Sequence, residues 1–160
     1  MTNAVLDKET FCRLVEEHQS ALYRTARSIL SNQQDAEDAV QEAFLRLLTL
    51  RPVFRDAEHE KAWLIRTTLH RAADLQKAAA KRNVPLEEAA QAAVPEPESA
   101  LLDAVRSLPE KYSAVIHLHY YEGYSIREIA KLLGVPSPTV GTRLARGRER
   151  LRQLLKEDFS

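Results

Sequence analysis

The chain has 160 residues and a formal net charge of zero, with 44% hydrophobic and 29% charged residues. This composition excludes a disordered chain and predicts a globular protein of one or two small domains. No apolar run approaches the ~18 residues of a membrane-spanning helix, and no basic stretch with an apolar core opens the chain, so neither membrane insertion nor secretion is expected. The single cysteine, Cys12, fits a reducing cytoplasm and is expected to be buried on a helix.

The N-terminal half has the pattern of a helical bundle. Few glycines and no sustained strand alternation predict an all-α chain. Helices are predicted over residues 8–30 and 59–81, and the helix between them carries apolar residues spaced three and four apart. They form one stripe that is expected to face the core: Ala36, Ala39, Val40, Ala43, Phe44, Leu47 and Leu48.

A change of composition divides the chain. Residues 83–98 hold three prolines, four glutamates and no aromatic residue, which is typical of a linker and too poor in large apolar groups for a core. We therefore expect two small helical bundles, residues 1–82 and 99–160, that move independently in the free protein. Residues 111–160 carry a net charge of +4. A local basic region on a neutral chain points to a localised anionic partner, with nucleic acid as the leading candidate.

The C-terminal part predicts a helix-turn-helix. Helices are predicted over residues 99–107, 110–121, 126–133 and 138–156. Ser125 and Glu128 have the spacing of a capping box, and Gly134 supplies the left-handed residue that ends the short third helix. Ser137 is expected to cap the last helix, with Pro138 at its first position. A short helix, a tight turn and a longer helix are the layout of this DNA-binding motif.

The last helix separates apolar from basic residues. Its inward stripe is predicted to include Val140, Leu144 and Gly147, and Gly147 is expected to allow close contact with another helix. The other side carries Thr142, Arg143, Ala145, Arg146 and Arg150. Such a helix can enter the major groove, where its N-terminal residues read base edges and its arginines hold phosphates. A solvated basic helix of an ordinary bundle is the alternative.

Residues 101–155 resemble region four of extracytoplasmic-function sigma factors, through the segments LPEKY, YYEGYS and RERL. The resemblance implies that this part binds the −35 promoter element and the flap of the polymerase β subunit. Gly141 stands where the family usually has lysine or arginine, so one common contact is missing. The residues assigned to −35 DNA are Ser137, Thr139, Thr142, Arg143, Ala145, Arg146 and Arg150.

The segment DAEDAVQEAFLRLL, from Asp35 to Leu48, resembles the most recognisable motif of region two in the same family. The resemblance implies that this helix docks on the clamp helices of the polymerase β′ subunit. Opposite the buried stripe, the residues form an acidic polar face with one exposed leucine, which suits a basic, partly apolar partner. A merely solvated acidic face is the alternative. The face consists of Asp35, Asp38, Gln41, Glu42 and Leu45.

The segments FR (54–55) and AWLIR (62–66) resemble the promoter-melting part of region two, followed by the helix that reads the −10 element. His70 stands where the family usually has asparagine, and arginine is often found near the position of Lys77. From its apolar register, Trp63 is predicted to belong to the core and not to stack on a base. The resemblance assigns to −10 DNA the residues Trp63, Thr67, His70, Arg71, Asp74, Lys77, Lys81 and Arg82.

Taken over nearly the whole chain, the resemblance implies an alternative sigma factor that binds core RNA polymerase and promoter DNA without a metal or cofactor. It further implies a cytoplasmic protein, monomeric when free, that is held by an anti-sigma factor. An enzyme is the first rival, but the chain has no phosphate loop or nucleophile elbow, and His117 and His119 lie on different helix faces. A helix-turn-helix repressor, or a sigma-like protein that does not melt DNA, remains an alternative.

Overall fold

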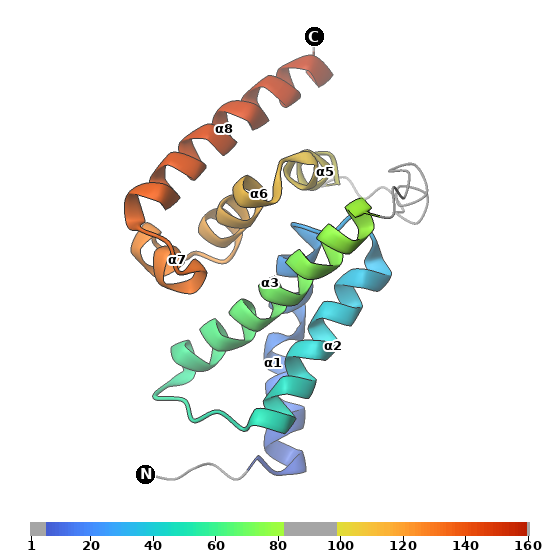
Figure 1. The fold of residues 1–160 in the computed structure, drawn as a ribbon, viewed down its shortest axis with the longest axis vertical. Helices are drawn as coiled ribbons and strands as arrows, with labels where there is room; N and C mark the ends of the chain where they lie inside the picture. Colours follow the sequence, from blue (N-terminus) through green and yellow to red (C-terminus); the bar gives the residue numbers. More distant parts are fainter. Residues whose placement is uncertain (1–5, 82–98, 160) are drawn as a thin grey trace.

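The computed structural model describes residues 6–81 and 99–159, so the expected linker and Arg82 lie outside the described residues. Within these ranges every regular element is a helix, which confirms the all-α prediction, and the helices form two bundles (Figure 1). The elements are α1 (Lys8–Arg27), α2 (Gln33–Leu50), α3 (Ala57–Lys81), α5 (Ser99–Ser107), α6 (Glu110–Ile116), the π-helix η1 (His117–Tyr121), α7 (Ile126–Leu133) and α8 (Ser137–Phe159). No helix in the described ranges is long and apolar enough to cross a bilayer.

Helices α1, α2 and α3 pack around one core in the N-terminal bundle. The predicted stripe of α2 is buried, with Ala36, Ala39 and Ala43 fully inaccessible. Leu48 is the exception, because its side chain is 39% exposed. At 12 residues from Ala36, a helix with about 3.6 residues per turn places Leu48 roughly a third of a turn away from that residue, at the edge of the stripe.

The ends of the first two helices follow from short polar side chains. The Asp7 carboxylate accepts a hydrogen bond of 2.7 Å from the Thr10 N–H and caps α1. The Asn32 side chain accepts from the backbone at the start of α2, and Arg51 ends α2 in the left-handed conformation with φ 45°.

The expectation for Cys12 was wrong: it lies on the solvent side of α1 and is exposed.

Helices α5 to α8 form the C-terminal bundle, in which α8 packs against α5, α6 and α7. The Ser125–Glu128 capping box is present, and Gly134 ends α7 with φ 68°. Helix α8 begins at Ser137, one residue earlier than predicted, and its first hydrogen bonds run to the Pro136 carbonyl. The prediction for Gly147 is confirmed, because a Cβ atom there would lie 3.1 Å from the Ile116 side chain.

The predicted single helix over residues 110–121 is divided. Helix α6 ends at Ile116 and continues as η1, whose geometry joins the Glu122 N–H to the His117 carbonyl at 3.1 Å. This wider turn also brings the His117 Nε2 atom to 2.9 Å from the Glu122 carboxylate. The π-helix therefore pairs two polar side chains that are both buried.

The contact between the two bundles includes several polar groups. From α3, the Arg66 guanidinium donates hydrogen bonds of 3.0 Å to the Lys131 and Leu132 carbonyls at the C-terminal end of α7. The Glu122 carboxylate also lies 3.5 Å from Arg24 and 3.9 Å from Lys61 of the N-terminal bundle. The sequence predicts independent bundles, whereas the structure places them against each other.

Candidate nucleic-acid interface

Helix α8 directs its basic residues to solvent because its apolar residues are held in the bundle. Val140 and Leu144 are buried, at 0% and 1% exposure. The side chains predicted to bind −35 DNA therefore face outward. Ser137, Thr142, Ala145, Arg146 and Arg150 are exposed, and Thr139 and Arg143 are half-buried.

The arginines of α8 differ in their surroundings. The Arg150 guanidinium lies over the Tyr112 ring at 4.9 Å, and Arg148 donates a hydrogen bond of 2.9 Å to the Tyr120 hydroxyl. Arg152 pairs with Glu149 at 3.3 Å. Among the described residues, neither Arg143 nor Arg146 forms an ion pair with a carboxylate. No carboxylate among the described residues therefore neutralises these two arginines of the N-terminal half of α8, although Arg146 also contacts the Tyr112 hydroxyl.

The acidic face of α2 is exposed around Leu45, whose side chain is 56% exposed as predicted. Asp38 and Gln41 are exposed beside it, and Asp35 and Glu42 are half-buried. The structure adds two cations that sequence reasoning did not place there. Arg46 pairs with Glu42 at 3.4 Å, and Arg71 of α3 pairs with Asp38 at 3.6 Å. Leu50 at the end of α2 and Val53 shortly after it are also exposed.

A groove of about 490 Å³ between α2 and α3 collects most of the residues predicted to bind −10 DNA. Besides Glu42 and Arg46 of α2, it is lined from α3 by Thr67, His70, Arg71, Ala73, Asp74 and Lys77. Trp63 and Lys81 are not part of it. Trp63 is half-buried against the core and packs on Phe54 with 5.8 Å between ring centroids, in agreement with its register.

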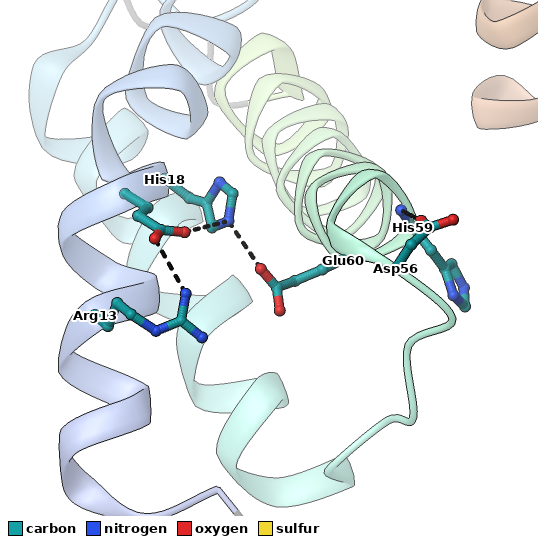
Figure 2. Close-up of polar contacts among 6 residues, drawn as sticks. Arg13, His18, Asp56, His59 and Glu60 are labelled. Carbon is teal, nitrogen blue, oxygen red and sulfur yellow. Dashed lines mark hydrogen bonds and ion pairs between the residues drawn. The ribbon is translucent and has the colours of Figure 1, made fainter. Parts of the chain in front are cut away.

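The start of α3 contacts α1 through Glu60 and is capped by the Asp56 side chain (Figure 2). The His18 Nε2 atom lies 3.2 Å from the Glu60 carboxylate and 3.7 Å from Glu17, and Glu17 also pairs with Arg13 at 3.0 Å. In the first turn, the Asp56 side chain accepts a hydrogen bond of 2.8 Å from the backbone of α3. Glu17, His18 and Glu60 are close enough together to hold a metal ion. Their mutual contacts and Arg13 satisfy them, and we interpret the cluster as a link between helices.

Electrostatics at the contact between bundles centre on Glu122, whose side chain is 2% exposed. Burial opposes its ionisation, but the His117 hydrogen bond and the cations Arg24 and Lys61 outweigh it, so the pKa of Glu122 is lowered. Burial and the nearby Glu122 charge raise the pKa of Tyr124 to about 12. The His117 Nδ1 atom is buried without a partner. The His117 Nε2 atom donates to Glu122, because an ionised carboxylate can only accept a hydrogen bond.

The fold and these surfaces define a helix-turn-helix protein in which a second helical bundle carries a separate acidic face. Two family models match the chain: Sigma-70 region 2 over residues 14–82 and Sigma-70, region 4 over residues 98–151. The chain is 32% identical to the RNA polymerase sigma factor SigV of Bacillus subtilis, over 91% of this chain and 92% of that protein. It is 34% identical to the ECF RNA polymerase sigma factor SigM of Mycobacterium tuberculosis, over 93% of this chain and 79% of that protein.

Solved structures agree with this result. The structure of CnrH in complex with the cytosolic domain of CnrY superposes with a TM-score of 0.71 at 27% identity, covering 98% of this chain and 94% of that one. The sigma factor RpoE in complex with NepR from Bartonella quintana has the same fold, with a TM-score of 0.72 at 22% identity, over 91% of this chain and 96% of that one. The chain therefore belongs to the extracytoplasmic-function sigma factors, alternative sigma factors that direct RNA polymerase to specific promoters.

Proposed function

We propose that this sigma factor binds polymerase and promoter through three separate surfaces. The α2 docking face, defined by Asp35, Asp38, Gln41, Glu42 and Leu45, binds the clamp helices of the polymerase β′ subunit. The groove between α2 and α3 binds the −10 element, and the exposed side of α8 binds the −35 element. Residues 1–82 and 99–160 form the two functional domains.

The observation that carries this proposal is the state of Arg143 and Arg146. Both lie near the N-terminus of a helix whose opposite face is buried, and neither has a carboxylate partner among the described residues. Base edges in the major groove are read by side chains at this end of a recognition helix. Unpaired guanidinium groups at that end suit the bidentate contacts that arginine makes with guanine.

The −10 assignment is supported by the composition of the α2–α3 groove. It combines the cations Arg71 and Lys77 with polar groups of Thr67, His70 and Asp74 in one concave surface. Concave sites of this kind hold an unstacked base through hydrogen bonds, while cations follow the phosphates. The pair between Asp38 and Arg71 joins the docking face to this groove, so polymerase docking and −10 binding share an ion pair.

A transcription assay with purified core polymerase tests the proposal. The chain should start transcription from a promoter carrying suitable −35 and −10 elements, and changes in either element should lower the yield. A gel shift with and without core polymerase separates this function from that of a repressor, because a repressor would shift promoter DNA alone. Failure to form a complex with core polymerase would overturn the assignment of α2.

We infer an anti-sigma partner, because the sigma factor RpoE, which has the same fold, was solved in complex with the anti-sigma factor NepR, and CnrH was solved with the cytosolic domain of CnrY. We further propose that the chain is cytoplasmic and that it is a monomer when it is not bound to a partner. The experiment is to co-express the chain with the product of the neighbouring open reading frame and to measure transcription. An anti-sigma factor should abolish transcription and co-purify in a one-to-one complex. Unchanged transcription with every neighbouring product would contradict a genetically linked inhibitor.

A further inference from the structure

We propose that Lys111 of α6 is an additional DNA-backbone contact of this sigma factor, and that it grips a phosphate beside the −35 bases that α8 reads. This inference rests on the proposed function of α8. Residue 111 lies outside the helix-turn-helix, in the first turn of the preceding α6.

The geometry places Lys111 at the recognition surface. A groove of about 330 Å³ runs between the start of α6 and the N-terminal half of α8. From α6 it is lined by Lys111 and Tyr112, and from α8 by residues that include Thr139, Thr142, Arg143 and Arg146. Lys111 thus shares one concave surface with the side chains assigned to −35 DNA.

The charge of this groove favours an anion. Its lining contains three cations, Lys111, Arg143 and Arg146, and no carboxylate. Among the described residues Lys111 forms no ion pair, so its ammonium group is not neutralised within the chain. A groove lined with unpaired cations next to a recognition helix suits the phosphates that border the major groove.

Tyr112 holds the cations in place. Its ring is buried at 4% exposure, with Lys111 at 5.1 Å and Arg150 at 4.9 Å from the ring centroid. Burial would raise the pKa of the Tyr112 phenol, but the charge of Lys111, a hydrogen bond from Arg146 and the charges of Arg150 and Arg146 together lower it. Cation–π contacts restrict long side chains that otherwise lose entropy on binding. Tyr112 is therefore a positioning residue for these cations.

Phosphate contact, and not base reading, follows from where Lys111 stands. In the proposed complex α8 enters the major groove of the DNA, and α6 lies beside α8. A side chain of α6 therefore meets the phosphates at the edge of the major groove and not the bases inside it. Lysine presents a compact charge on a flexible stem, which binds phosphate without the planar geometry that base recognition needs. Gly141 removes a cation from α8 itself, and Lys111 supplies one from the neighbouring helix.

The test uses the holoenzyme and duplex DNA carrying the −35 element, with affinity measured over a series of salt concentrations. Lys111→Ala should weaken binding about three- to tenfold, equally for preferred and altered −35 sequences, and should lower the salt slope by about 0.9. Lys111→Arg should restore both values. Lys156→Ala removes an equal charge from the far end of α8 and should change neither.

A scan with single uncharged methylphosphonate linkages then locates the contact. One linkage should weaken the parent holoenzyme and leave Lys111→Ala unaffected. If Lys111→Ala behaves like Lys156→Ala while Arg146→Ala weakens binding, this inference fails and the proposed function stands. If Arg146→Ala has no effect either, the proposed role of α8 fails. A loss confined to the preferred −35 sequence would make Lys111 a base contact and overturn the inference.

Discussion

Charged side chains at the centre of the α2 docking face differ from those at the start of α8 in whether they already form ion pairs. In the N-terminal bundle, Asp38 pairs with Arg71 and Glu42 pairs with Arg46. On α8, Arg143 and Arg146 have no carboxylate partner among the described residues. A partner of α2 must exchange internal ion pairs for new ones, whereas DNA meets unpaired guanidinium groups.

Because of this difference, the affinity of the α2 docking face for polymerase and the affinity of α8 for DNA should come from different interactions. Exposed ion pairs are worth only ~0–1 kcal/mol, so exchanging one pair for another gains little. At the α2 docking face, the affinity should come mainly from the 56% exposed Leu45. At α8 the unpaired charges should dominate, and with them a strong dependence on salt.

The largest effect is expected at the apolar centre of the docking face. Leu45→Asp should weaken assembly with core polymerase by about 2–4 kcal/mol, the scale of an interface anchor. Glu42→Gln, which removes an already paired charge, should cost less than about 1 kcal/mol. Competition binding against the parent chain measures both, and circular dichroism should show unchanged helicity because Leu45 is outside the core. Equal losses for the two variants would remove the contrast.

The second effect concerns the unpaired charge of α8. Arg146→Ala should cost about 1–3 kcal/mol at the preferred −35 sequence and relax the base preference at one position. Arg148→Ala is the matched control, because it removes an equal charge two residues further along α8, on another face of the helix. Transcription from a panel of −35 variants gives both profiles. If Arg146→Ala lowers every promoter equally, Arg146 holds a phosphate and the reading face is misplaced.

A third, smaller effect is expected at Glu122, a buried charge that joins the bundles. Its folded pKa lies below the usual 4.5. Its carboxylate therefore adds stability that is fully present above the unfolded pKa and is lost as the pH falls through the folded pKa. Glu122→Gln should lower the free energy of unfolding at pH 7 by about 1 kcal/mol. The difference from the parent chain should shrink below about pH 4.5.

Urea unfolding of both chains tests this at several pH values, with the fluorescence of Trp63 as the signal. Trp63 is the one tryptophan of the chain, and it lines a groove of about 600 Å³ that includes Glu122 and Tyr124 of the other bundle. Its emission therefore reports on the contact between bundles. A difference that stays constant from pH 7 to pH 3.5 would show that the Glu122 charge does not contribute.

Local features of the fold could be predicted from the sequence. The Ser125–Glu128 capping box, the left-handed Gly134 and the close approach at Gly147 were all predicted and are present. Each depends on residues within one turn or on helix register. The exposure of Leu45 follows from the same register, because it lies opposite the buried stripe.

Non-local pairs could not be predicted in this way. Arg71 and Asp38 are brought together only by the packing of α3 on α2, and Arg66 meets α7 across the two bundles. No spacing signal in the segment HLHYYEG predicts that a π-helix will bury His117 against Glu122. Leu48 shows the limit of periodicity, because the burial of a side chain at the edge of an apolar stripe depends on which neighbours cover it.

The smallest effect is expected from adding a charge to α8. Gly141 has helical geometry, and a Cβ atom there would meet nothing within 4 Å, so a side chain fits without a clash. Gly141→Lys should steepen the salt dependence of DNA binding by about 0.9 if the new charge reaches a phosphate. It should strengthen binding for all −35 sequences alike. Gly141→Ala is the control, because it gives a similar gain in helix propensity, about 1 kcal/mol, without the charge. Binding that strengthens equally in both variants would mean that helix stability, and not charge, limits recognition by α8.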